Sequence, residues 1–101
     1  MLFKGCGINI VTPFTDTNEV DFDSLGRLVD TYINIGAKAL ILGRTTGEFF
    51  AMSDNEILEV VDFVVKRVNN KIPVLAQTGL NDTSRSVVLS IRARALGLDG
   101  L

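Results

Sequence analysis

The stretch ALILGRTTGE at residues 39–48 decides the fold. Its first four residues are all apolar, which is typical of a strand buried on both faces of a parallel sheet. A glycine closes the run, and residues 44–48 then carry two adjacent threonines, a second glycine and two charges. In parallel βα folds the loops that follow the strands carry the chemistry. Residues 44–48 are therefore the first place to look for a site.

Similar apolar runs recur on both sides of this stretch. GINIVT at residues 7–12 is closed by Pro13, and IPVLA at residues 72–76 is closed by the turn residues 77–79. Residues 99–101 look like the first step of a fourth strand. Helical patterns separate the runs, so the order is β-α-β-α-β-α-β with roughly 30 residues per unit, as in βαβ repeats. This order predicts an α/β fold with a parallel sheet covered by helices.

Helix start and stop signals delimit three helices between these runs. Asp21 is placed to cap the first helix and Gly36 to follow its end. Ser53 and Glu56 form a capping box for the second helix, which ends at residues 69–70. The third helix follows Asn81 or Asp82 and stops at Gly97.

Apolar residues at helical spacing define the face that each helix is expected to bury. Asp62 and Lys66 lie on the polar face of the second helix as a favourable i,i+4 pair, and Arg92 points outward from the third. The expected inward residues are Phe22, Leu25, Leu28, Val29, Tyr32 and Ile33, then Ile57, Val60, Val61, Val64 and Val68, then Val87, Val88, Ile91 and Ala95.

Composition excludes several classes of function. The net charge is −2 and the ten basic residues are scattered, so no footprint for nucleic acid or an anionic membrane is expected. Cys6 is the only cysteine, which excludes an internal disulfide and a cysteine-rich metal site. Histidine is absent, so the usual zinc ligand and the usual near-neutral base are missing. No signal-peptide pattern and no membrane-length apolar run is present. A cytoplasmic protein without metal or cofactor is the expectation.

The loops after the three strands, at 12–14, 44–48 and 77–81, are rich in hydroxyls and glycines. Thr45 and Thr46 offer two hydroxyls beside the backbone N–H groups of a glycine turn, a suitable cradle for a carboxylate or keto acid. Strand-to-helix turns also hold glycine and threonine for backbone reasons alone. From spacing alone, both interpretations stay open.

Four longer segments carry a resemblance to a known family. VTPF at 11–14, TTGE at 45–48, IPVLAQTGLNDT at 72–83 and ALGLDGL at 95–101 resemble, in order and spacing, the dihydrodipicolinate synthase/N-acetylneuraminate lyase family, with the synthase branch closest. The resemblance implies a partial TIM (β/α)8 barrel: the first three βα units plus the start of strand 4. Residues 1–101 would then be the N-terminal portion of the barrel, a single incomplete domain.

The resemblance also implies a lyase activity and roles for individual residues. The family condenses pyruvate with an aldehyde, aspartate semialdehyde in lysine biosynthesis, through a Schiff base on a lysine of the sixth strand. By position, Thr45 would be the proton-relay hydroxyl, and Thr46 with Gly47 would hold the carboxylate of a pyruvate-like keto acid. Glu48 and Asn81 match family positions near the site or its subunit contacts.

Two positions depart from the family pattern. Arg44 and Gln77 stand where the family usually has glycine, which keeps the mouth of the barrel open. Arg44 could bind a carboxylate bidentately, or it could show that the site is no longer under functional constraint. The second alternative is favoured because the rest of the catalytic set is missing.

The Schiff-base lysine itself is not matched in this sequence. A covalent imine needs a desolvated amine at the barrel mouth. Lys4, Lys38 and Lys71 each precede a strand, on the face opposite to the site, and Lys66 lies on the polar side of a helix. The chain is therefore expected to be inactive alone.

Three hypotheses follow: an inactive truncated relative, an enzyme half completed by another chain, or a non-catalytic oligomeric or anion-binding module. Right-handed crossovers place all three helices on one face of the sheet. The other face, with Ile10, Ile41 and Leu75 as candidates, would be exposed and normally buried by a partner. We therefore expect a homo-oligomer formed through the sheet face or edge.

Overall fold

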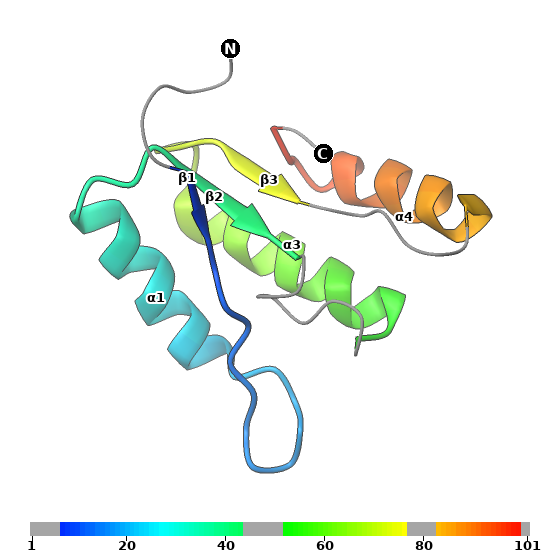
Figure 1. Cartoon of the computed structure of the whole chain (residues 1–101), viewed down its shortest axis with the longest axis horizontal. Helices are drawn as coiled ribbons and strands as arrows, with labels where there is room; N and C mark the ends of the chain where they lie inside the picture. Colours follow the sequence, from blue (N-terminus) through cyan, green and yellow to red (C-terminus); the bar gives the residue numbers. More distant parts are fainter. Residues whose placement is uncertain (1–6, 44–51, 77–82, 100–101) are drawn as a thin grey trace.

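The computed structural model describes residues 7–43, 52–76 and 83–99, and the side chains of its last helix from residue 86. Three parallel strands alternate with three helices, as the sequence predicts (Figure 1). The elements are β1 (Gly7–Asn9), α1 (Phe22–Asn34), β2 (Ala39–Leu42), α3 (Asp54–Val68), β3 (Val74–Ala76) and α4 (Thr83–Ala95).

The sheet has the order β1-β2-β3, with both neighbouring pairs parallel. Its register places Ile8, Leu40 and Val74 side by side, so these three side chains share one face. The outer strands are shorter than their apolar runs, since β1 covers only three residues of 7–12 and β3 three of 72–76. The predicted fold class is confirmed.

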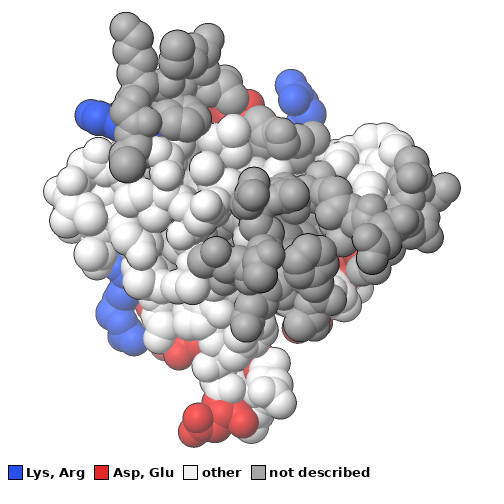
Figure 2. Space-filling model, in the orientation of Figure 1, with Lys and Arg blue, Asp and Glu red and all other residues white. Residues whose placement is uncertain are grey.

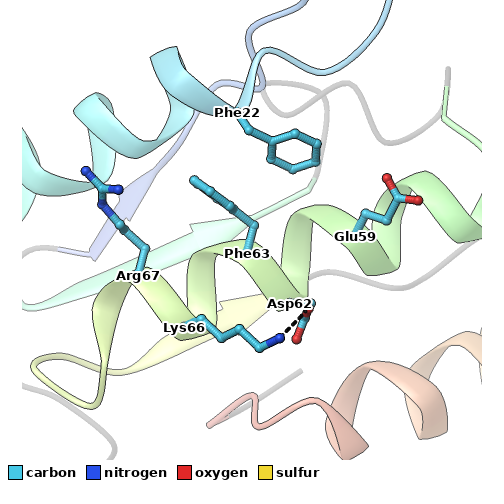
Figure 3. A pocket seen from close by; sticks show the side chains of 6 residues that line it. All are labelled: Phe22, Glu59, Asp62, Phe63, Lys66 and Arg67. Carbon is cyan, nitrogen blue, oxygen red and sulfur yellow. Dashed lines mark hydrogen bonds and ion pairs between the residues drawn. The ribbon is translucent and has the colours of Figure 1, made fainter.

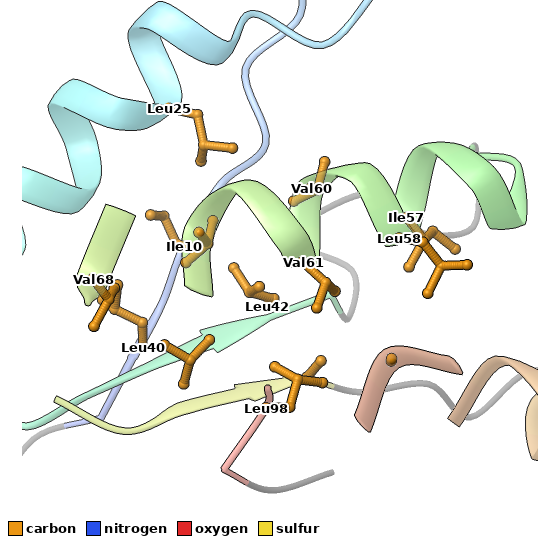
Figure 4. Packing of buried hydrophobic residues seen from close by; sticks show 14 of the residues in the cluster. Ile10, Leu25, Leu40, Leu42, Ile57, Leu58, Val60, Val61, Val68 and Leu98 are labelled. Atoms are coloured by element: carbon orange, nitrogen blue, oxygen red, sulfur yellow. The ribbon is translucent and has the colours of Figure 1, made fainter. Parts of the chain in front are cut away.

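One face of the sheet carries the core, and the alternation of side chains along the strands decides which residues belong to it. Leu40 and Leu42 are buried among residues of the helices, whereas Ile41 between them is only partly buried (Figure 4). Leu75 shares the face of Ile41 and is also partly buried. These two were correctly expected on the helix-free face.

The expectation for Ile10 was wrong. The Ile10 side chain is 1% exposed, and its backbone N–H donates to Ile41 O at 3.1 Å, which extends the β1–β2 ladder beyond the strand. That register aligns Ile10 with Leu42 on the helix-covered face, and Asn9 takes the exposed position instead.

The predicted caps of α1 and α3 are confirmed. The Asp21 side chain accepts from the Ser24 backbone N–H at 3.1 Å, and this bond, with a second from the Ser24 hydroxyl, lowers the pKa of Asp21. Ser53 and Glu56 exchange both bonds of the capping box, at 3.0 and 3.2 Å. The expected apolar stripe of α3 is buried throughout.

The face assigned to α4 was wrong. Val87, Val88, Ile91 and Ala95 are exposed, whereas Leu89 and Ala93 are buried against the core. The sequence of α4 has two apolar stripes at helical spacing, the predicted one and a second that contains Leu89 and Ala93. In the structure the second stripe packs against the core. Arg92 is exposed as expected.

The chain after α4 returns to the edge of β3, as the predicted fourth strand requires. Leu98 is buried, the Asp99 backbone N–H donates to Val74 O at 2.9 Å, and the Asp99 carboxylate accepts from the Val74 N–H at 2.8 Å. Within the described ranges no helix has the length and apolarity needed to cross a membrane.

Candidate functional site

The carboxyl ends of the three strands lie at one edge of the sheet, where βα folds place their ligands. Thr12 follows β1 and is buried, Gly43 follows β2 and is buried, and Ala76 ends β3. The candidate site residues follow β2 and β3 in the sequence. All of them lie outside the described residues and remain predictions: Arg44, Thr45, Thr46, Gly47, Glu48 and Asn81.

Gly43 controls the direction in which the chain leaves β2. Its φ of 93° lies in the left-handed region, which is costly for any residue with a Cβ atom. A glycine at this point therefore fits the turn that ends β2. This position is one residue earlier than the family glycine that Arg44 replaces.

The described lysines lie away from this edge. Lys38 immediately precedes β2 and is exposed, and Lys71 precedes β3 and is exposed. Lys66 is on the outer side of α3, where its ammonium donates to the Asp62 carboxylate at 3.0 Å. Lys4 is not among the described residues. Those parts of the chain that are described also hold no cluster of ligands suited to a metal ion.

A separate cleft of about 550 Å³ opens between α1 and α3 on the outer surface of the helix layer (Figure 3). Phe22 and Phe63 line it and contact each other, with ring centroids 5.0 Å apart and planes tilted by 52°. Its rim consists of charged residues of α3, namely Glu59, Asp62, Lys66 and Arg67. Lys66 and Arg67 are both ion-paired, so the cleft offers no uncompensated cation.

The Arg67 guanidinium joins α3 to α1 through two bonds to the Asp30 carboxylate, at 3.0 and 2.6 Å. The helices approach closely here because Gly26 has no side chain: an added Cβ would lie 3.2 Å from Arg67 Cζ and 3.3 Å from the Phe63 ring. The bonds from Arg67 hold the pKa of Asp30 below its usual value.

The Asp30–Arg67 pair gives a pH-dependent contribution to stability. Because the pKa of Asp30 is lowered in the folded chain, the contribution is complete above the unfolded value of about 3.9 and is lost as the pH falls through the lower folded value. We expect Asp30→Asn to lower stability at neutral pH in urea unfolding, with the difference from the parent chain shrinking in strong acid. Asp16→Asn, at an exposed turn, is the control for the loss of one negative charge. A difference for Asp30→Asn that is constant with pH would contradict this linkage.

Sequence reasoning missed both the Asp30–Arg67 pair and the cleft. The two partners are 37 residues apart, and no local spacing relates them. Only a glycine within an otherwise regular helix, such as Gly26, could have indicated that another helix packs closely there.

Comparisons with known proteins give matches over nearly the whole chain. The model of the dihydrodipicolinate synthetase family matches residues 2–101. A 4-hydroxy-tetrahydrodipicolinate synthase of Caldicellulosiruptor bescii is 49% identical over 100 residues, covering 99% of this chain and 34% of the relative. The 4-hydroxy-tetrahydrodipicolinate synthase of Staphylococcus haemolyticus is 41% identical over 100 residues, again covering 99% of this chain and 34% of the relative. The chain thus spans about a third of the length of the curated relatives it matches.

Solved structures agree with these sequence matches. Dihydrodipicolinate synthase from Aquifex aeolicus superposes with a TM-score of 0.92 at 37% identity, over 97% of this chain and 33% of that one. A chloride-inhibited synthase from Acinetobacter baumannii, solved with pyruvate, gives 0.93 at 33% identity, over 98% and 34%. The match over nearly every residue, together with the parallel βα order, shows that this chain belongs to the dihydrodipicolinate synthetase family.

Proposed function

We propose that these 101 residues supply the keto-acid-binding part of a 4-hydroxy-tetrahydrodipicolinate synthase and form no Schiff base by themselves. One observation supports the expected lack of a Schiff base: each described lysine lies away from the carboxyl edge of the sheet. Lys38 and Lys71 precede their strands, and Lys66 is ion-paired outside α3. An imine requires an unprotonated amine beside the bound carbonyl, and these positions do not provide one.

Thr45 and Thr46, which follow β2, carry the hydroxyl and backbone N–H groups that keto-acid binding needs. In this proposal the Thr45 hydroxyl relays a proton, and Thr46 with Gly47 binds the carboxylate of pyruvate through its hydroxyl and backbone N–H groups. The pyruvate complex of the Acinetobacter relative supports the class of ligand. Condensation with aspartate semialdehyde in cytoplasmic lysine biosynthesis would need the amine from outside these 101 residues.

Borohydride reduction in the presence of pyruvate tests this division of labour. Reduction of an imine links pyruvate irreversibly to its amine, so intact-mass measurement detects the adduct. We expect the chain alone to keep its unmodified mass, while the Caldicellulosiruptor bescii relative gains one adduct under the same conditions. A pyruvate adduct on any of the four lysines of this chain would refute the proposal.

The helix-free face of the sheet favours a second property, self-association. Figure 1 shows α3 behind the sheet, and in Figure 2 the described atoms on the side turned to the viewer belong mostly to uncharged residues. Ile41 and Leu75 lie on this face and are only partly buried. Apolar surface of this kind is normally covered by a partner.

Light scattering at micromolar concentration checks the second property. We expect a mass of at least twice 11.0 kDa for the chain alone. Ile41→Lys should reduce the mass toward that of a monomer, because it places a charge within the contact. Lys38→Glu, outside the sheet face, is the control and should leave the mass unchanged. A monodisperse monomer of the parent chain would contradict self-association.

A further inference from the structure

Asn9 carries a polar side chain on the helix-free face of the sheet. The register pairs Asn9 with Ile41 and Ile41 with Leu75, so these three residues form one row across the sheet. Side chains alternate between the two faces along a strand, and the row therefore lies on one face. Asn9 is exposed, whereas Ile41 and Leu75 are partly buried. The row thus combines one carboxamide with two apolar side chains.

Neither strand formation nor packing explains an asparagine at this position. Asparagine is depleted in β-strands, whereas Ile8 and Ile10 beside it are typical strand residues. In the described parts of the chain, the Asn9 carboxamide has no hydrogen-bond partner. The other strand side chains on its face are all apolar: Ala39, Ile41 and Leu75. A residue that departs from these local rules is expected at a functional site.

The helix-free face is the inner face of the complete fold. In a (β/α)8 barrel, the fold of the solved relatives, the side chains of this face fill the space that the strands enclose. Enclosing a carboxamide costs free energy unless its N–H and C=O groups find hydrogen-bond partners. The apolar side chains of Ile41 and Leu75 supply none. A polar molecule bound inside the strands would satisfy the Asn9 side chain.

The row that contains Asn9 lies close to the carboxyl edge, where βα folds bind their ligands. Gly43 follows Ile41 by two residues, which corresponds to about 7 Å along an extended strand. Gly43 has no side chain, and a glycine in a strand often marks a place where a ligand approaches the backbone. A small molecule held at this edge can therefore extend past Gly43 toward the Asn9 carboxamide.

We propose that Asn9 is a keto-acid-binding residue whose carboxamide N–H donates to the keto oxygen of the ligand. The inference rests on the proposed function, in which Thr46 and Gly47 hold the carboxylate. With the carboxylate at the edge, the adjacent keto group is the part of the ligand that faces the deeper row with Asn9. A carboxamide N–H is a suitable donor for this oxygen, and it distinguishes a keto acid from a simple carboxylic acid of the same length.

Side-chain NMR signals of the ¹⁵N-labelled full chain test this contact directly. On addition of pyruvate, the Asn9 carboxamide signals should shift with the same midpoint as the backbone amide of Thr46. The carboxamide of Asn55, exposed on α3, is the control and should not shift. Shifts at Thr46 without a shift at Asn9 would overturn the role of Asn9 and leave the proposed function intact. No shift at either residue would overturn both.

Propionate, which has the carboxylate of pyruvate but no keto oxygen, identifies the group that Asn9 binds. Asn9→Ala should weaken pyruvate binding about fivefold, the loss expected for one hydrogen bond between neutral groups, and leave propionate binding unchanged. Asn55→Ala should change neither affinity. The Asn9 side chain is exposed, so the variant retains the fold, as far-UV circular dichroism would verify. Equal losses for the two acids, or no loss for pyruvate, would contradict a bond to the keto oxygen.

Light scattering separates ligand binding from a contact between copies of the chain through the same face. Asn9→Ala should leave the mass in solution unchanged, because the apolar side chains of Ile41 and Leu75 remain. A lower mass of Asn9→Ala together with an unchanged pyruvate affinity would assign Asn9 to the contact between copies and overturn its role in keto-acid binding.

Discussion

Leu40→Ala is expected to lower the free energy of unfolding by about 3 kcal/mol, the largest effect we predict for a single substitution. Leu40 lies in the central strand β2, and its side chain is fully buried in the core that also contains Val68 and Val74. Truncation removes apolar contacts and leaves a cavity that the surrounding strands and helices cannot close. Urea unfolding monitored by far-UV circular dichroism measures the change.

The neighbouring residue provides the control for this prediction. Ile41 is in the same strand but on the helix-free face, where it is only partly buried. Ile41→Ala should therefore cost about 1 kcal/mol, since less apolar surface is lost. Measurements at low concentration separate folding from self-association through that face. Equal costs for the two variants would mean that the helices do not cover the face that contains Leu40.

Gly97→Ala is expected to lower the free energy of unfolding by about 2 kcal/mol. Gly97 follows α4 with a φ of 108°, a backbone conformation that costs a residue with a Cβ atom about 1–2 kcal/mol. An added Cβ would also lie 3.2 Å from Val65 Cγ1 of α3, so that side chain would have to shift. The turn at Gly97 directs the chain toward the edge of β3, and the substitution strains this return.

Gly36→Ala separates the cost of backbone strain from the cost of the contact with Val65. Gly36 has a φ of 92°, but an added Cβ would meet no atom within 4 Å. Its substitution should cost about 1 kcal/mol, from backbone strain alone. Thermal unfolding of both variants provides the comparison. If Gly97→Ala proves neutral, the chain does not take the left-handed turn after α4.

The sequence predicted those features that depend on neighbours a few residues away. Asp21 and Ser53 cap their helices through bonds to residues three positions on, and Gly36 follows α1 in the left-handed conformation. Asp62 and Lys66 pair across one helical turn. Each of these interactions is complete within a single segment, so its residues suffice to predict it.

The candidate site was predicted less completely. The strands that lead into it, with Thr12 and Gly43 at their ends, are in the predicted order and orientation. The roles of Thr45 and Thr46 came from the family resemblance and remain proposals. Hydroxyls and glycines after a strand are equally common in turns without any ligand, so the pattern alone does not distinguish a site from a turn.

By itself, the sequence determined the parallel βα order, the N-terminal caps of α1 and α3 and the absence of histidine and of a second cysteine. Only the tertiary structure decided which face of α4 is buried, that Ile10 belongs to the core, and that Asp30 meets Arg67. The physical reason is that periodicity within one segment identifies an apolar stripe, whereas the packing of separate segments decides what covers it. For α4 that packing buried Leu89 and Ala93 and left Val87, Val88 and Ile91 exposed.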